Sequence, residues 1–273
     1  MNTSLQVWPI PALQDNYIWC VHDGQSAVVV DPGESAPVIS FLQQNHLQLT
    51  GILITHYHAD HIGGIESLLK WHSSQVNGDN LAIPVYGPAA EDIPFRTRAL
   101  LEGDQVEFIK PALALGVLEV PGHTLGHIAY FAQARGTEPP RLFCGDTLFA
   151  SGCGRLFEGT PTQMSESLAK FLALPSETLM FCTHEYTLSN IRFALAVEPN
   201  NADLLAWSSQ AQAMRHSNQP TLPTTLGHER QVNPFLRCDQ APVIQAASQH
   251  ANHRQLKNKA EVLAVVRAWK DQF

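Results

Sequence analysis

Four short apolar runs of the chain each end directly before residues that can bind a metal ion. The run at residues 51–55 leads into the segment THYHADHIGG, in which three histidines and one aspartate occupy six positions. Three later runs lead in the same way into His123, Asp146 and His184. If these runs are neighbouring strands of layered sheets, their ends meet along one edge, where loops on a rigid scaffold gather the side chains. The pattern therefore predicts a strand-rich fold with one metal-binding edge.

The candidate ligands are more numerous than a single zinc ion needs, because zinc usually takes four. They are His56, His58, Asp60, His61, His123, Asp146 and His184. A set of this size suits two ions that share a bridging carboxylate and a bridging water. The mixture of imidazole and carboxylate groups admits zinc, iron or manganese. We therefore expect two divalent metal ions per chain, with zinc as the first expectation and iron or manganese as alternatives.

Other acidic and histidine residues near these runs have ordinary interpretations beside the functional one. Asp31 follows a strand-like run, and it is either an acceptor that orients a ligand histidine or a turn residue before Pro32. His127 is expected to pack near the site rather than to bind metal. For the four polar residues of THYHADHIGG, burial without a partner such as a metal would cost several kcal/mol, so a metal-free buried loop is disfavoured.

Strand signals fill the first two thirds of the chain and helical signals fill the rest. Strands are expected at 17–22, 27–31, 51–55, 83–87, 116–120, 128–132, 141–145 and 178–182. Helices are expected at 62–71, 162–174, 188–197, 202–216 and 259–269, and surface loops at 73–80 and 133–140. The chain is thus predicted to hold an α/β body, residues 1–185, followed by a smaller helical C-terminal domain, residues 186–273.

Composition excludes several classes of partner. The chain of 273 residues has a formal net charge of -8, which argues against a surface that binds nucleic acid or an anionic membrane. It has no run of about 18 apolar residues and no secretory signal pattern, so no membrane span is expected. Its five cysteines form no CxxC pair and are expected to be reduced thiols of a cytoplasmic protein.

Four motifs together resemble those of the metallo-β-lactamase superfamily. They are HxHxDH at 56–61, PGHT at 121–124, GDT at 145–147 and the later His184. The resemblance covers about the first 185 residues and implies an αββα sandwich, in which two facing mixed sheets carry helices outside and a dinuclear site at one edge. Because the superfamily includes thioesterases, lactonases, nucleases and oxygenases, the fold alone does not choose a reaction.

Further segments are similar to those of one family, the hydroxyacylglutathione hydrolases or glyoxalase II enzymes. These segments are GDTLFASGCGRLFEGT at 145–160, THEYTLSNIRFA at 183–194 and VRAWKDQF at 266–273. The resemblance implies hydrolysis of S-(2-hydroxyacyl)glutathione, such as S-D-lactoylglutathione, to glutathione and a 2-hydroxy acid such as D-lactate. That reaction is the second step of methylglyoxal detoxification, and the attacking group would be a hydroxide that bridges the two metals.

The same resemblance assigns roles to individual ligands. It places them as follows: His56, His58 and His123 on the first ion, Asp60, His61 and His184 on the second ion, and Asp146 as the bridge between the ions. With the bridging hydroxide, Asp60 and Asp146 are the expected catalytic residues. The thiolate leaving group needs little help from a general acid, because a thiol ionises near pH 8 to 9.

Glutathione carries two carboxylates, so an acidic protein needs local cations to bind it. The resemblance assigns substrate binding to Arg155, Phe157, Tyr186, Arg267 and Lys270. Some family members have Tyr where this chain has Phe157, so one hydroxyl contact is missing. Some have Lys in place of Arg155, and either residue binds a carboxylate. Arg267 and Lys270 share one helical face, which without the resemblance would be interpreted as a solvated face.

Alternative functions on the same fold are a glutathione persulfide dioxygenase with one iron, a lactonase and a nuclease. The acidic charge and the lack of an evident basic or aromatic nucleic-acid arm count against the nuclease. The segment CGRLFEGT and the cationic last helix favour a glutathione thioester over all three. The expected partner is therefore a small-molecule substrate, with no nucleic acid and no membrane, and the protein is expected to be a monomer.

Overall fold

The structure is a computed structural model that describes residues 4–75 and 82–273. The chain divides into two compact units, of which the first comprises Met1–Glu119 with Gly126–Gly145 and the second comprises Val120–Leu125 with Asp146–Phe273. A short segment of the second unit thus interrupts the first unit in the chain order. The domain boundary expected between residues 185 and 186 stays a prediction.

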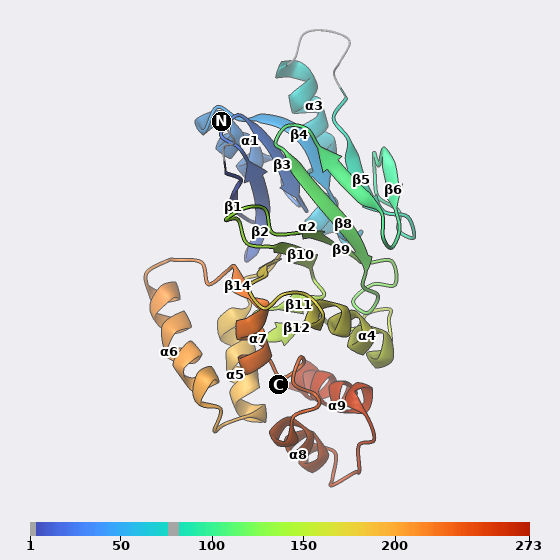
Figure 1. Ribbon diagram of the computed structural model, residues 1–273, viewed down its shortest axis with the longest axis vertical. Coiled ribbons are helices and arrows are strands. Elements are labelled where there is room, and N and C mark those ends of the chain that lie inside the picture. The colour runs from blue at the N-terminus through green and yellow to red at the C-terminus, as the bar shows by residue number, and fades with distance from the viewer. Residues whose placement is uncertain (1–3, 76–81) are drawn as a thin grey trace. The chain divides into compact units, whose positions relative to one another are not determined.

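The first unit contains a mixed sheet whose strands follow one another in chain order (Figure 1). Its strands are β1 (Gln6–Ala12), β2 (Asn16–His22), β3 (Ser26–Val30), β4 (Gln48–Leu53), β5 (Val85–Pro88) and β6 (Arg98–Leu100). Strands β1 to β3 are antiparallel neighbours, whereas β3 to β6 run parallel. Strands β2 and β3 are buried throughout, which explains why they read as continuous apolar runs rather than as alternating ones.

A second set of strands in the first unit faces this sheet. It comprises β7 (Gln105–Phe108), β8 (Leu113–Glu119), β9 (Ile128–Ala132) and β10 (Arg141–Gly145), each antiparallel to the next. The Tyr130 hydroxyl on β9 donates a 2.8 Å hydrogen bond to the carbonyl of Ile54 after β4. A Cβ atom on Gly51 of β4 would lie 2.2 Å from the ring of Phe108 on β7, so the glycine gives these sheets room to pack closely.

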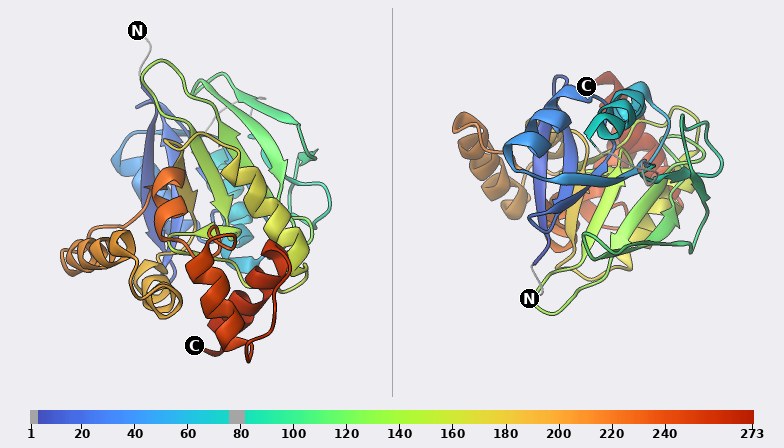
Figure 2. Two further views of the ribbon diagram at one scale, coloured as in Figure 1. Left: turned by 60° about the horizontal axis from the view of Figure 1, so that its bottom comes forward. Right: turned by 90° about the horizontal axis from the view of Figure 1, so that it is seen from above.

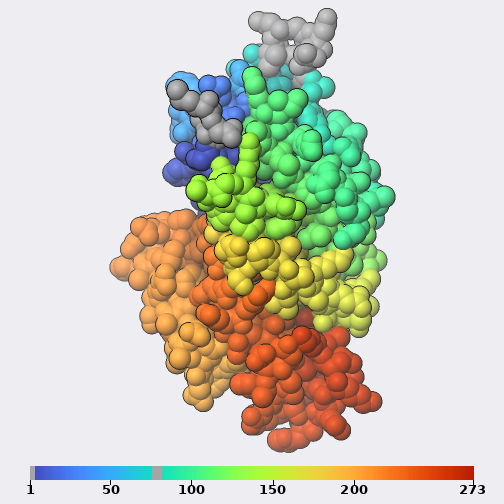
Figure 3. Space-filling model, viewed as in Figure 1, coloured from blue at the N-terminus to red at the C-terminus, as the bar shows by residue number. Residues whose placement is uncertain are grey.

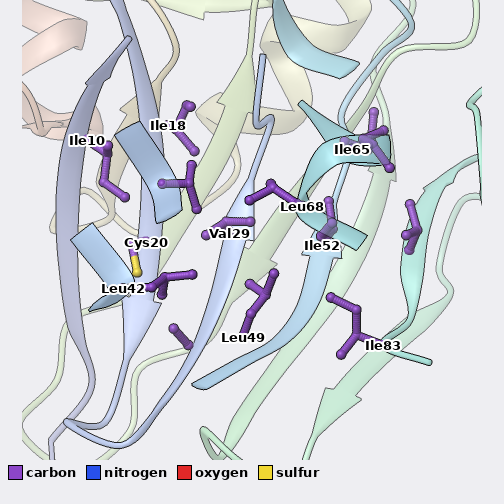
Figure 4. Close-up of a cluster of buried hydrophobic side chains, with 14 of the residues drawn as sticks. Ile10, Ile18, Cys20, Val29, Leu42, Leu49, Ile52, Ile65, Leu68 and Ile83 are labelled. Carbon is purple, nitrogen blue, oxygen red and sulfur yellow. The ribbon is translucent and has the colours of Figure 1, made fainter. Parts of the chain in front are cut away.

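Helices α1 (Ala36–Gln44) and α3 (Ile65–Gln75) cover the opposite face of the first sheet (Figure 2, right). Because successive side chains of a strand point to opposite faces, one alternate set meets these helices. Figure 4 shows the resulting core, in which Leu42 of α1 and Leu68 of α3 lie among Ile18, Val29 and Ile52 of the sheet. The first unit is therefore layered as helices, mixed sheet and antiparallel strands.

The second unit is mainly helical. Its helices are α4 (Pro161–Leu172), α5 (Thr187–Val197), α6 (Ala202–His216), α7 (Leu226–Val232), α8 (Ala241–His250) and α9 (Lys259–Gln272). Its short strands are the hairpin β11 (Leu148–Phe149) and β12 (Gly152–Cys153) and the pair β13 (Leu179–Cys182) and β14 (Thr224–Thr225). Helices α8 and α9 pack against each other, and their residues belong to the orange-red and red region of the surface in Figure 3. Helix α4 begins with a capping box formed by Thr160 and Gln163, which satisfies backbone N–H groups at its first turn.

The structure contains strands at all the expected places, but it splits one expected helix and adds the helices α1, α7 and α8, which the sequence did not predict. The helix expected at 62–71 is two helices, α2 (Ala59–Ile62) and α3, separated by Gly63–Gly64. Because α3 continues to Gln75, residues 73–75 of the expected surface loop at 73–80 are helical, while residues 76–80 lie outside the described part. The sequence did not predict β1, whose prolines at 9 and 11 are tolerated because it is an edge strand.

Two further expectations concern membranes and thiols. Among the described residues, no helix is long and apolar enough to cross a membrane. All five cysteines are buried, and none forms a disulfide in the described part of the chain. Burial raises the pKa of the Cys20 thiol to about 12, so this thiol is a protonated core residue at neutral pH.

Replacement of Leu42 by Ala should lower the free energy of unfolding by about 2–5 kcal/mol, because it removes fully buried methyl groups and leaves a cavity. Urea unfolding measured by tryptophan fluorescence reports this loss. Leu101 is 55% exposed, so the matched change Leu101→Ala should stay within about 0.5 kcal/mol of the parent. Equal losses in the two variants would contradict the assignment of this core.

Candidate metal centre and substrate site

The first unit places four of the expected ligands on the turn that follows β4. The chain leaves the sheet through the buried residues Ile54, Thr55 and His56, and α2 begins after His58, which is its N-cap residue. A Cβ atom on Gly33 would lie 1.9 Å from the Asp60 carbonyl oxygen. The loop after β3 therefore touches the backbone of this turn and fixes it, which only a glycine permits.

Hydrogen bonds define which nitrogen atoms of two histidines face each other. The Thr55 hydroxyl donates to Asp31 Oδ2 at 2.7 Å and lies 3.1 Å from Nδ1 of His56. Because this hydroxyl already donates its proton, it accepts from Nδ1–H, and Nε2 of His56 keeps its lone pair. That Nε2 atom lies 3.0 Å from Nδ1 of His58. Two imidazole nitrogens at this separation suit a shared metal ion.

Asp31 orients His61 in the same way. Its Oδ2 atom lies 3.1 Å from Nδ1 of His61, and its Oδ1 atom accepts the backbone N–H of Thr55 at 2.8 Å. With the proton of His61 on Nδ1, the lone pair of Nε2 faces Asp60 Oδ2 at 3.5 Å. Asp31 is also a turn residue, because it has a φ of 51° and its carbonyl accepts the N–H of Gly33, while its role in orienting a metal-binding histidine stays a prediction.

The second unit brings together the other three expected ligands. His123 lies in the segment Val120–Leu125, Asp146 follows β10 and His184 follows β13. Nε2 of His123 lies 3.5 Å from Asp146 Oδ2, and Nε2 of His184 lies 3.3 Å from the same oxygen. Nδ1 of His123 donates to the carbonyl of Arg155 at 2.8 Å. The carboxylate of Asp146 therefore lies between two imidazole rings.

These contacts fit metal ions chemically. Nε2 of His123 and Nε2 of His61 each carry a lone pair that faces a carboxylate oxygen, and such an arrangement is repulsive unless a cation or a proton lies between the two atoms. Metal-bound histidines commonly hold their second nitrogen on a carboxylate or a carbonyl, as both residues do here. All seven expected ligands belong to groups able to hold a metal ion, and their kind and number are compatible with a binuclear centre.

Two of the expected substrate-binding residues are exposed aromatic rings beside the ligands of the second unit. Phe157 is 60% exposed, and its ring centroid lies 5.3 Å from that of His123. Tyr186 stacks on His184 with centroids 4.6 Å apart and ring planes within 3°. The guanidinium of Arg155 lies 5.9 Å from the Phe157 centroid. The second unit thus presents apolar surface and a cation next to Asp146.

The cations of α9 are not a solvated face. Arg267 is only 6% exposed, and it donates to the Cys153 carbonyl at 2.8 Å and to Asp271 Oδ1 at 3.1 Å. Lys270 donates to Asn190 Oδ1. Burial, with a further contribution from the Arg267 charge, lowers the pKa of Lys270 to about 7. Both cations are therefore partly dehydrated, which strengthens their attraction for an anion.

Several residues that support the site were not predicted from the sequence. Asn16 Nδ2, for example, donates to Asp60 Oδ2 at 3.0 Å. The packing of His127 near the site was predicted, and its ring stacks on His56 with centroids 4.6 Å apart. Asp271 also contacts Nε of Arg155 at 3.2 Å. Asp271 lies inside the segment VRAWKDQF and could have been found there, whereas nothing in the sequence near Asn16 indicates its contact.

Comparison with known proteins identifies the relatives of the chain. The family model for the metallo-beta-lactamase superfamily matches residues 13–184, and the model for the hydroxyacylglutathione hydrolase C-terminus matches residues 185–273. A hydroxyacylglutathione hydrolase of Cupriavidus taiwanensis is 58% identical over 98% of this chain and 99% of that protein. One from Cupriavidus metallidurans is 55% identical with the same coverage.

A solved structure is also similar to the chain. A crystal structure of a protein in a di-iron-bound form matches 84% of this chain and 100% of that chain, with a TM-score of 0.57 and 26% identity. The full-length identity to the Cupriavidus proteins, together with the two family models, covers both the strand-rich and the helical parts of the sequence. The chain therefore belongs to the hydroxyacylglutathione hydrolase family within the metallo-beta-lactamase superfamily.

Proposed function

We propose that the protein hydrolyses thioesters of glutathione, with S-D-lactoylglutathione as its main substrate, to glutathione and a 2-hydroxy acid such as D-lactate. One observation of the structure carries this proposal. The second unit holds the imidazole–carboxylate group of His123, Asp146 and His184 together with the buried cations Arg267 and Lys270. The same unit thus offers groups for hydrolysis and groups for a substrate with two carboxylates.

The metal assignment combines the ligands of both units. We infer that the ions are held by the following residues: His56, His58 and His123 for one, Asp60, His61 and His184 for the other, and Asp146 for both. When bound, two divalent ions supply a water of lowered pKa and polarise a carbonyl oxygen. The protein's own contribution is orientation. Asp31 and the Arg155 carbonyl fix His61 and His123 through their Nδ1 atoms.

Asp60 is proposed to act on the attacking water. Its Oδ2 atom accepts a hydrogen bond from Asn16, which restricts the rotation of the carboxylate. A carboxylate held in this way can accept a hydrogen bond from the water and so direct one of its lone pairs at the thioester carbonyl. The departing thiol has a reference pKa of about 8.5, so it leaves as a thiolate without a dedicated general acid.

Glutathione recognition is assigned to Arg155, Phe157, Tyr186, Arg267 and Lys270. The two exposed rings, Phe157 and Tyr186, would pack on the apolar parts of the substrate. Arg155 and Arg267 both contact Asp271, so a substrate carboxylate would compete with Asp271 for them. Phe157 lacks the hydroxyl that a tyrosine would offer, and its contact with the substrate is therefore apolar.

Four narrower expectations accompany this proposal and stay predictions. Zinc is expected in both metal positions, with iron or manganese as alternatives. The protein is expected to be a monomer. It is expected in the cytoplasm, and its reaction is expected to serve methylglyoxal detoxification.

The central test is hydrolysis of S-D-lactoylglutathione by enzyme loaded separately with zinc, iron or manganese. We expect turnover, followed by loss of thioester absorbance, in at least one form. Removal of metal by a chelator should abolish turnover, and metal addition should restore it, because no other water-activating group is assigned. Absence of turnover in all three forms would reject the proposal, and oxygen consumption with glutathione persulfide would favour the dioxygenase.

The double change Arg267→Ala with Lys270→Ala should raise KM for S-D-lactoylglutathione by about tenfold or more, because each charged hydrogen bond contributes about 1.5–3 kcal/mol. Metal content should be unchanged, since neither residue is an assigned ligand. Steady-state kinetics and elemental analysis measure the two quantities. Arg254 is an exposed cation of the same unit, and Arg254→Ala should leave KM unchanged. An unchanged KM in the double variant would remove both residues from the substrate site.

The pKa of Lys270 predicts a pH dependence of KM. Lys270 is protonated below its pKa of about 7 and neutral above it, so an anionic substrate loses one attractive charge as pH rises. We expect KM of the parent enzyme to increase as pH rises through 7. In the Lys270→Arg variant the guanidinium stays charged, so KM should not show this increase near pH 7. Parallel KM profiles for the two enzymes would contradict the role of Lys270.

A further inference from the structure

The β11–β12 hairpin is held at successive backbone positions by side chains of the helical part of the second unit. Three residues donate to its carbonyl groups, in these bonds: Asn233 to Phe149 and Gly152 at 3.0 Å each, Asn190 to Ala150 at 2.9 Å, and Arg267 to Cys153 at 2.8 Å. A Cβ atom on Gly152 would lie 2.5 Å from Asn190. The hairpin therefore has little freedom to move relative to α5 and α7.

The tip of the hairpin is held by a carboxylate. Ser151 is buried and has a φ of 55°, a conformation that non-glycine residues adopt only when the surroundings enforce it. Its backbone N–H donates to Glu229 Oε2 at 2.7 Å. The same oxygen accepts Asn233 Nδ2 at 3.0 Å, and Oε1 accepts the Thr224 hydroxyl at 2.8 Å. Glu229 thus ties the tip to β14 and to the end of α7.

Glu229 is fully buried, and a buried carboxylate costs more free energy than a neutral side chain of the same shape. Burial raises its pKa to about 7, while the hydrogen bonds from Ser151, Thr224 and Asn233 oppose that change. A glutamine at this place would have one acceptor oxygen and would turn an amide N–H₂ toward a donor. Only the carboxylate accepts on both sides, so it is suited to hold the tip in one position.

The far end of the hairpin reaches the groups assigned to the substrate. The Cys153 carbonyl orients the guanidinium of Arg267. Two residues later the Arg155 carbonyl accepts Nδ1–H of His123, and the Arg155 side chain itself is a proposed substrate contact. Asp146, by contrast, precedes the hairpin and is placed between His123 and His184. A shift of the tip therefore moves the backbone groups that position Arg155 and Arg267.

We propose that Glu229 is a positioning residue for glutathione recognition, acting through the β11–β12 hairpin on Arg155 and Arg267. The proposal rests on the function proposed above, because those two cations matter only for a substrate that carries carboxylates. It assigns no contact between Glu229 and the substrate. It predicts a larger effect on glutathione recognition, through the side chains of Arg155 and Arg267, than on metal binding, through the single contact of the Arg155 carbonyl with His123.

The test is Glu229→Gln in the full-length, metal-loaded enzyme. KM for S-D-lactoylglutathione should rise about five- to tenfold, which corresponds to the loss of about one ordinary hydrogen bond, while kcat and metal content stay near the parent values. KM for S-lactoyl-N-acetylcysteamine, a thioester without the two carboxylates, should not change. An unchanged KM for the glutathione thioester, or an equal rise for both substrates, would overturn the proposal.

The matched control is Glu198→Gln. Glu198 is also a buried carboxylate of the second unit, but its oxygens accept from the Arg237 guanidinium, at 2.8 and 2.9 Å, rather than from the hairpin. This variant should lose stability in thermal unfolding and keep the parent KM. If Glu198→Gln raised KM as much as Glu229→Gln, general loosening of the unit would explain both results and the proposal would fail.

Two further measurements keep the test decisive. If Glu229→Gln does not fold, Thr224→Val removes one hydrogen bond to the same carboxylate and should raise KM by about two- to threefold. An unchanged KM in that variant would count against the proposal.

Binding of S-methylglutathione, a thioether that cannot be hydrolysed, measures recognition without turnover. A parent enzyme that binds it but hydrolyses no thioester would refute the proposed function, while the effect of Glu229→Gln on its Kd still decides the role of Glu229.

Discussion

A carboxylate that is buried away from water is stable only where donors or cations surround it, and this constraint organises the functional parts of both units. In the first unit Asp31 is surrounded by the backbone and hydroxyl of Thr55 and by the ring of His61. In the second unit Asp146 lies between two imidazole rings, and Glu229 collects three hydrogen bonds. Each carboxylate thereby fixes side chains that a loop alone would leave mobile.

The three carboxylates have different roles, although nearby donors or cations stabilise each of them in the same way. Asp31 Oδ2 lies 3.1 Å from Nδ1 of His61, whose other ring nitrogen lies 3.5 Å from Asp60 Oδ2. Asp146 has two histidine nitrogens facing one oxygen, which is repulsive in the absence of a cation and is thus suited to metal. Glu229 has only N–H and O–H donors around it, which suits a structural role. The type of neighbouring group, rather than burial itself, distinguishes a carboxylate suited to metal, such as Asp146, from one that holds a backbone segment in place, such as Glu229.

Much of the fold was predictable, because strands buried on both faces leave continuous apolar runs and α4 carries its own capping residues. Elements without such signals were missed. Strand β1 contains prolines, and α7 begins at Leu226, after its N-cap residue Thr225, inside a stretch that reads as a loop. The seven metal-ligand candidates were predictable because they follow apolar runs and match the superfamily motifs. Asn16, Asn233 and Glu229 were not, because their partners lie 44, 84 and 78 residues away in the chain.

The sequence by itself determined the types of residue that end each strand, the division into strand-rich and helical parts, and the family. These properties are local, or are carried by motifs of fixed spacing. Only the tertiary structure decided which nitrogen of each histidine is held by a second partner and that Arg267 and Lys270 are buried rather than solvated. It also decided that the carboxylate of Glu229 holds the β11–β12 hairpin through the backbone of Ser151. The reason is physical: burial and hydrogen-bond partners depend on contacts between distant segments, and no local pattern encodes them.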